Sequence, residues 1–233
     1  MRFDATTAEP VPWKNGGGTT RELALQERAG KLLWRLSLAD ITRNGPFSAF
    51  PGVQRIHTIV EGRGLDLRGA DEVLQARPLK PLRFDGGMPL DATLIGGPCR
   101  AFNVIYDPAQ VQADMVVFAE SIRAAAGDIL YAITSDLTLS DDTILTEGQG
   151  LRCPVAPCGQ AEVHFVVVRQ LLTAFVHFKV ERIAAHDHQF VRTVHHGNPC
   201  PQNNRWGHIV GQRLRIAVVG CIAVIIRVRV LQH

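Results

Sequence analysis

The sequence WRLSLADI at residues 34–41 and the sequence QRIHTIV at residues 54–60 decide the fold class. In each stretch apolar and polar side chains alternate, which is the period of a half-buried β-strand. The alternation in the second stretch places Arg55, His57 and Ile59 on one face. We therefore predict two β-strands, the second of which carries polar side chains along a single face.

Short strands separated by Gly and Pro turns continue this pattern toward residue 168. No long segment has the 3.6-residue period of an amphipathic helix, although residues 121–126 are compatible with one helical turn. The turn at residues 61–64 leads into residues 65–67, which predicts a hairpin. The other predicted strands are residues 72–75, 81–84, 92–95, 102–106, 114–118, 129–134, 143–146 and 163–168. This succession predicts an all-β protein, built as a sandwich, barrel or jelly roll.

The composition is that of an ordinary soluble globular protein, with 46% apolar and 20% charged residues in a chain of 233. This length suffices for one large all-β domain or two small ones. Residues 1–15 have neither the basic segment nor the apolar segment of a secretory signal, so we expect a cytoplasmic protein. Five cysteines in such a protein do not imply disulfides, and Cys99 is expected in the core or in a turn.

The charge of the chain changes sign after about residue 150. Residues 151–233 carry 10 of the 25 Lys and Arg, 3 of the 22 Asp and Glu, and eight of the nine His. We therefore divide the chain into a domain at residues 1–168 and an atypical basic, His- and Cys-rich tail at residues 169–233. A shifted reading frame, disorder and a genuine basic extension are alternative explanations of this tail. Its apolar run at residues 216–226 is too short to cross a bilayer, which takes about 20 helical residues.

A glycine triplet at residues 16–18 resembles a phosphate-binding loop at first sight. Its spacing matches neither the GxxxxGK[ST] loop of nucleotide-binding proteins nor the GxGxxG dinucleotide fingerprint. A turn that uses positive φ and leads into a strand is the simpler interpretation.

Several short motifs together resemble the HutD/Ves family. They are VPWKNGGGTTRE at residues 11–22, WRLSLADI at 34–41, GPFS at 45–48, FPGVQRIH at 50–57, PLRFDGG at 81–87, GPCR at 97–100 and FNV at 102–104. The resemblance implies a bicupin, with two jelly-roll-like β-barrels in one compact unit. It also implies an association with histidine utilisation in bacteria and assembly as a homodimer.

The resemblance and the strand pattern together place a ligand pocket around Arg55. An Arg inside a jelly roll is costly to bury unless it is paired, and its planar guanidinium matches a carboxylate through two parallel hydrogen bonds. From the residues alone, a solvent-facing Arg55 or a structural ion pair is an equal alternative. Members of the family are thought to bind small carboxylates such as urocanate through an Arg at the matching position.

The resemblance implies further residues for this pocket, namely His57, Trp13, Lys14, Asn15, Arg35, Ser37 and Asn103. His57 would form a wall of the pocket or a hydrogen bond within it, and Lys14 would contact the anion. For Arg35 a surface or salt-bridge position is the favoured alternative. Asn103 and Phe102 are assigned to the lining of the second half, and for Phe102 a plain core position is the favoured alternative.

Metal ligands are not recognisable in the expected place. Enzymatic cupins usually bind a divalent metal through His-x-His, a Glu and a later His, whereas residues 54–64 contain a single His. Residues 186–188, HDH, have the spacing but lack the following Glu. Cys153 and Cys158 with later His and Cys are possible zinc ligands, but no second CxxC pair supports them. We predict no metal and no cofactor.

We therefore expect a non-catalytic protein that binds urocanate or N-formylglutamate and modulates histidine utilisation. The alternative is a metal-independent cupin-fold enzyme acting on a small carboxylate, with His57 as the nearby general acid or base. A third interpretation, nucleic-acid binding by the basic tail, has little aromatic support beyond Phe190 and Trp206. The expected partner is thus a small carboxylate, without membrane or nucleic acid.

Overall fold

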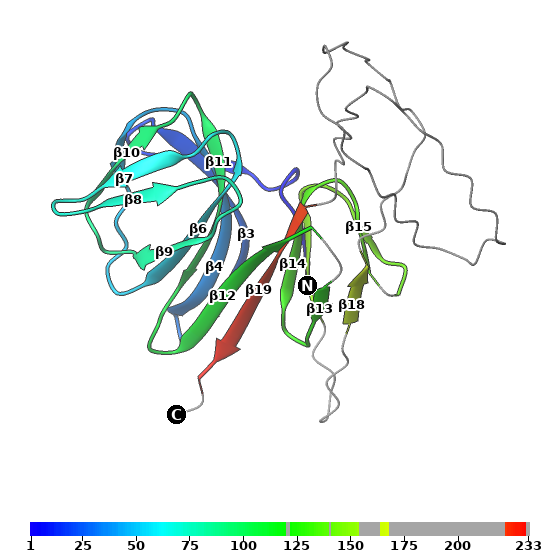
Figure 1. Cartoon of the computed structure of the whole chain (residues 1–233). Coiled ribbons are helices and arrows are strands. Elements are labelled where there is room, and N and C mark those ends of the chain that lie inside the picture. Colours follow the sequence, from blue (N-terminus) through cyan, green and yellow to red (C-terminus); the bar gives the residue numbers. More distant parts are fainter. Residues whose placement is uncertain (120–121, 140, 154–163, 168–221, 232–233) are drawn as a thin grey trace, which may run out of the picture. The chain divides into compact units, whose positions relative to one another are not determined.

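The structure is a computed structural model that describes residues 1–119, 122–139, 141–153, 164–167 and 222–231 (Figure 1). Every regular element in these residues is a β-strand. The described residues contain no helix that is long and apolar enough to cross a membrane. Residues 168–221, which hold most of the predicted tail, lie outside the described residues. The boundary at residue 168 and the explanations of the tail therefore stay predictions.

The first half of the chain contains a six-stranded antiparallel sheet. Its strand order is β2 (Pro10–Pro12), β3 (Gly18–Arg28), β4 (Lys31–Ile41), β11 (Cys99–Tyr106), β6 (Gln54–Glu61) and β9 (Leu82–Asp85). The sequences WRLSLADI and QRIHTIV lie on β4 and β6 as predicted, on either side of β11. This arrangement brings residues far apart in sequence onto one surface.

A second sheet of four strands faces the six-stranded sheet across an apolar core. Its strand order is β5 (Gly45–Phe47), β10 (Leu90–Leu94), β7 (Leu65–Arg68) and β8 (Val73–Ala76). The core between the two sheets takes Ile59 from β6, Leu65 and Leu67 from β7, and Phe84 from β9. No ladder among the described strands joins the two sheets, so the first half is a sandwich of jelly-roll type.

The second half repeats this plan with a five-stranded and a four-stranded sheet. The five-stranded sheet has the order β1 (Arg2–Asp4), β17 (Gln149–Arg152), β14 (Ile129–Thr134), β19 (Ile222–Val230) and β12 (Val111–Phe118). The four-stranded sheet has the order β13 (Ile122–Ala124), β18 (His164–Val167), β15 (Leu137–Leu139) and β16 (Ile144–Leu145). The prediction of an all-β, cupin-like fold is thereby confirmed.

Strand β19, red in Figure 1, pairs with β14 on one side and with β12 on the other. Its residues alternate between two apolar cores: Val224 and Ile226 face the core shared by the two halves, and Ala223 and Ile225 face the core of the second half. Burial on both faces explains why residues 222–226 of this strand are all apolar. It belongs to the same compact unit as residues 1–170.

Two local predictions were wrong. Residues 61–64 do not form a hairpin, because β6 and β7 belong to different sheets and the turn carries the chain from one sheet to the other. Gly62 and Gly64 make this crossing with φ of 90° and 102°, which favours glycine. The single helical turn predicted at residues 121–126 is instead β13, an edge strand that pairs with β18.

Candidate functional site

A cavity of about 290 Å³ lies on the inner face of the six-stranded sheet, and we call it the arginine cavity. It is lined by Val11, Pro12, Trp13, Thr20, Glu22, Arg35, Ser37, Ala39, Phe47, Ser48, Phe50, Arg55, Asn103 and Ile105. Residues of β2, β3, β4, β11 and β6 form its floor, and residues 47–50 complete its wall. All the lining residues come from the first half.

The floor of the cavity is organised by the register of the strands. Arg35 on β4 lies opposite Ile105 on β11, which lies opposite Arg55 on β6. Directly opposed residues of antiparallel strands point to the same face, so both arginines project from one row into one cavity. Strand spacing places their Cα atoms roughly 10 Å apart.

The neighbouring row of the floor carries uncharged and acidic polar groups. Glu22 on β3 lies opposite Ser37, Ser37 lies opposite Asn103, and Asn103 lies opposite His57. The two rows are one strand repeat apart, roughly 7 Å. The cavity therefore combines a row of positive charge with a row of hydrogen-bonding groups.

Arg55 is buried with 5% of its surface exposed, and no ion pair joins it to an acidic side chain of the described residues. Its Nη1 donates to the carbonyl oxygen of Ser48 at 3.0 Å, and its Nη2 donates to Oδ1 of Asn103 at 3.2 Å. Its Nε is buried without a hydrogen-bond partner. A buried cation with neutral partners and a free N–H is an incomplete anion site.

Aromatic rings surround the guanidinium of Arg55. Its Cζ lies 4.5 Å from the ring centroid of Phe47, 5.3 Å from that of Phe84 and 5.5 Å from that of Phe50. The Cζ of Arg35 lies 5.5 Å from the same Phe50 centroid. Cation–π contacts of this kind hold a guanidinium in place and offset part of its lost hydration. The ring of Phe50 thus contacts the guanidinium groups of both arginines.

The positive charge at this site is uncompensated. Burial, followed by the positive charge of Arg35, lowers the pKa of the Arg55 guanidinium to about 9. Arg55 therefore still carries its charge at neutral pH. The Nε of Arg35 is also buried without a hydrogen-bond partner. Two adjacent cations with unused N–H groups favour an anionic ligand.

His57 lies behind Asn103 and does not line the arginine cavity. Its ring is fully buried, between Phe47 at 5.6 Å and Phe84 at 6.4 Å, both in edge contact. Its Nδ1 lies 2.7 Å from Oδ1 of Asn103. His57 was predicted as a wall of the pocket or as a hydrogen-bonding residue within it. The ring does not line the cavity, but it forms a hydrogen bond with Asn103, which does, and its role toward a ligand stays a prediction.

The hydrogen bonds of Asn103 determine which ring nitrogen of His57 carries the proton. A guanidinium only donates, so the Asn103 atom that faces Arg55 is the amide oxygen, as its Nδ2 bond to the carbonyl oxygen of Ala101 also requires. That oxygen cannot donate to His57, so Nδ1 of His57 carries the proton. Burial, followed by the charge of Arg55, lowers the pKa of His57 to about 4, so the ring is neutral at pH 7. His57 thus fixes Asn103, and Asn103 fixes Arg55.

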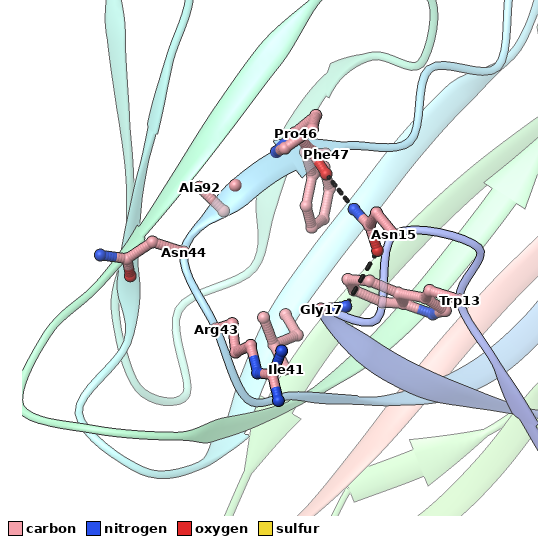
Figure 2. A pocket seen from close by; sticks show the side chains of 10 residues that line it. Trp13, Asn15, Gly17, Ile41, Arg43, Asn44, Pro46, Phe47 and Ala92 are labelled. Carbon is pink, nitrogen blue, oxygen red and sulfur yellow. Dashed lines mark hydrogen bonds between the residues drawn. The ribbon is translucent and has the colours of Figure 1, made fainter.

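The glycine triplet forms a tight turn beside a second, smaller cavity of about 60 Å³, the loop cavity (Figure 2). Gly16 has a φ of 67°, and a Cβ on Gly18 would meet the carbonyl oxygen of Asp40. The amide of Gly16 donates to the Trp13 carbonyl, and that of Gly17 donates to Oδ1 of Asn15. Because its amides are used within the turn, the loop is not a phosphate cradle.

Asn15 ties this turn to the wall of the arginine cavity. Figure 2 shows its Nδ2 donating to the carbonyl oxygen of Pro46, at 3.0 Å. Trp13 donates from Nε1 to Oγ1 of Thr20 at 2.7 Å and makes an edge contact with Phe47. Trp13 and Phe47 line both cavities, so the two rings form the partition between them.

Five of the predicted pocket residues line the arginine cavity, namely Trp13, Arg35, Ser37, Arg55 and Asn103. Asn15 lines the loop cavity, and Lys14 is exposed and lines neither of the two. Asn103 was assigned to the second half, which is wrong, because β11 belongs to the six-stranded sheet. Phe102 faces the shared core, as its alternative reading held. Whether these residues bind a ligand stays a prediction.

Nine residues that line the cavity had no predicted role in it, among them Glu22, Phe47, Ser48 and Phe50. The signal for the phenylalanines was their position just before β6, because a chain that turns directly into the strand of Arg55 stays close to it. No local signal marked Glu22, whose place follows from pairing with β4.

The described residues contain no group of three or more His, Cys, Asp or Glu side chains that could hold a metal ion. Cys99 and Cys153 are free and buried, and burial raises the pKa of each thiol to about 11. Cys158 and residues 186–188 lie outside the described residues, so their predicted alternatives stay untested.

Comparisons with known proteins agree with this architecture. The family model HutD matches residues 5–163. An uncharacterised 21.2 kDa protein from the hutC 3' region of Pseudomonas putida is 38% identical over 138 residues, which cover 56% of this chain and 72% of that protein.

Two solved structures share the fold. HutD from Pseudomonas fluorescens SBW25 has a TM-score of 0.69 at 23% identity, covering 100% of this chain and 99% of that chain. A conserved protein of unknown function from Pseudomonas aeruginosa PAO1 has a TM-score of 0.66 at 21% identity, covering 98% and 97%. The chain therefore belongs to the HutD family, which is linked to the histidine-utilisation locus.

Proposed function

We propose that the arginine cavity binds a small carboxylate of histidine degradation, urocanate or N-formylglutamate, and that occupancy modulates histidine utilisation without a bond being broken. The observation that carries this proposal is the buried, unpaired guanidinium of Arg55. Location in the cytoplasm and assembly as a homodimer belong to the same proposal.

The energetic argument rests on what Arg55 lacks. A buried charge without a partner of opposite sign costs several kcal/mol, and neutral hydrogen bonds offset only part of it. A carboxylate that accepts from the free Nε–H supplies the missing charge through a short, charge-assisted contact. Ile105, which lies between the two arginines on the floor, leaves the position between them apolar and unoccupied by a competing acid.

The enzyme alternative loses its candidate residue in this geometry. A general acid or base must come within hydrogen-bond reach of the ligand, directly or through one water. His57 is fully buried behind Asn103, and its Nε2 has no partner. The proposal therefore assigns His57 to the support of Arg55 and not to proton transfer.

The test is calorimetric titration of urocanate, and separately of N-formylglutamate, into the protein and its Arg55→Met variant. Loss of the charge-assisted contact is expected to cost about 1.5–3 kcal/mol, a tenfold or greater weakening of binding. Arg55→Lys keeps the charge but not the planar fork, so we expect an intermediate affinity.

Arg152→Met is the matched control. Arg152 also has a buried Nε without a partner and stacks on an aromatic ring, that of Trp34 at 5.6 Å, but it does not line the cavity. Its replacement should leave affinity unchanged. Failure of both ligands to bind the folded wild-type protein would overturn the proposal. Conversion of either ligand to a product, detected by chromatography, would support the enzyme alternative.

A further inference from the structure

The arginine cavity carries one acidic side chain, Glu22, besides Arg35 and Arg55. These three are the charged residues among those that line it, so two positive charges and one negative charge leave a net charge of +1. No ion pair joins the Glu22 carboxylate to another described residue. Glu22 is exposed on β3.

The strand register places Glu22 away from Arg55. Glu22 lies on β3 and Arg55 on β6, with β4 and β11 between them. Three strand spacings separate the two strands, which amounts to roughly 14 Å between their backbones. Both residues line the cavity, and Ser37 lies opposite Glu22, so the space between Arg55 and Glu22 runs across Ser37.

The other oxygens of the lining are already engaged or uncharged. Oδ1 of Asn103 accepts from both Arg55 and His57, and Oγ1 of Thr20 accepts from Trp13. The remaining side-chain hydroxyls are those of Ser37 and Ser48. Glu22 is therefore the charged acceptor in the lining, which can accept a charge-assisted hydrogen bond from a ligand N–H.

We infer that Glu22 determines the ligand class: monocarboxylates that carry an N–H donor or a positive charge at the end opposite the carboxylate. This inference rests on the proposed function, because the carboxylate end must occupy the arginines. A second carboxylate at the far end faces the like charge of Glu22, which disfavours dicarboxylates. The cavity's net charge of +1 matches a single negative charge on the ligand.

The test compares three ligands in wild-type protein and in Glu22→Gln by calorimetric titration at pH 7. Urocanate has a carboxylate and a ring N–H, 3-(2-furyl)acrylate has the same acrylate on a five-membered ring without an N–H, and N-formylglutamate has two carboxylates. Wild type should bind urocanate at least tenfold more tightly than the furan analogue, and both more tightly than the dicarboxylate.

In Glu22→Gln the affinity for urocanate should fall about tenfold, that for the furan analogue should stay within twofold, and that for N-formylglutamate should rise several-fold. Glu27→Gln is the matched control, because Glu27 is exposed on the same strand and does not line the cavity. It should change none of the three affinities.

The outcomes separate this inference from the proposed function. Binding that depends on Arg55 but keeps the same ligand preference in Glu22→Gln would overturn the role of Glu22 and leave the carboxylate site intact. Tighter wild-type binding of N-formylglutamate than of urocanate would overturn it as well. Absence of binding by all three ligands would overturn both.

Discussion

The two halves of the molecule share a plan of two facing sheets but have opposite interiors. In the first half Ser37, Arg55, His57 and Asn103 are buried within the sandwich. In the described residues of the second half, the core between the sheets is formed by side chains such as Leu130, Leu137, Leu139, Leu145 and Ile225. The buried acid of that half, Asp128, binds the Ala125 amide and faces Arg227 at 3.7 Å.

The two halves therefore differ in what their interiors contribute to stability. A closely packed apolar sandwich gains stability from every buried side chain, whereas a cavity with a buried cation gives up part of that gain. The shared core, to which Trp34, Phe102, Tyr131 and Val224 contribute, joins the two interiors. We infer that the second half supports a first half that is specialised for a ligand, and three predictions test this contrast.

The largest effect is expected from a charge placed in the second half. Leu130→Arg puts an unpaired cation in a fully buried apolar position, and we expect a loss of more than about 4 kcal/mol in the free energy of unfolding. Urea denaturation measures it. Ile144→Arg is the control, since Ile144 is 52% exposed in the same half and should tolerate the charge. A near-native midpoint for Leu130→Arg would show that this interior is as permissive as the first.

An intermediate effect is expected from protonation of His57. Its pKa of about 4 lies below the usual 6.5, so between these values the unfolded chain binds a proton that the folded chain excludes. The contribution of His57 to the free energy of unfolding is therefore complete above pH 6.5. It decreases by about 3 kcal/mol as the pH falls from 6.5 to 4. Urea unfolding at a series of pH values should give a flatter profile for His57→Gln than for wild type. Parallel profiles would show that the ring is not held neutral.

The smallest effect is expected from removing the charge of the first half. Arg55→Met replaces an unpaired buried cation with an apolar side chain that fits between Phe47 and Phe84, so we expect a gain of about 1 kcal/mol in stability while binding is lost. Thermal unfolding without ligand measures it. Arg21→Met should instead lose stability, because Arg21 pairs with Asp40. A destabilised Arg55→Met would mean that Arg55 has a structural role.

Much of the fold was predictable because local alternation and turn residues indicate each strand. Residues 129–134 were predicted as a strand with the bounds that the structure shows. Alternation correctly placed Arg55 and Ile59 on one face of their strand, which the structure shows to be the inner face. The hairpin at residues 61–67 failed because a Gly-rich turn looks the same whether the chain returns to its own sheet or crosses to another. That choice depends on contacts made elsewhere in the chain.

The site was predictable only in part, for the same reason. Arg55 and Arg35 were found on strand patterns, but their common row depends on β11, which follows β6 by nearly forty residues and inserts between the two strands. The family resemblance placed His57 in the pocket, on the same strand face as Arg55. The structure shows that the next row is covered by Asn103 and Phe47, which no spacing within one strand indicates.

The position of β19 has a consequence for biosynthesis. Every residue that lines the arginine cavity, from Val11 to Ile105, is translated before β12. The five-stranded sheet instead waits for Ile222 to Val230, because β19 separates β12 from β14. The sandwich of the first half can thus assemble early, while its packing surface on the second half is completed only when β19 is available.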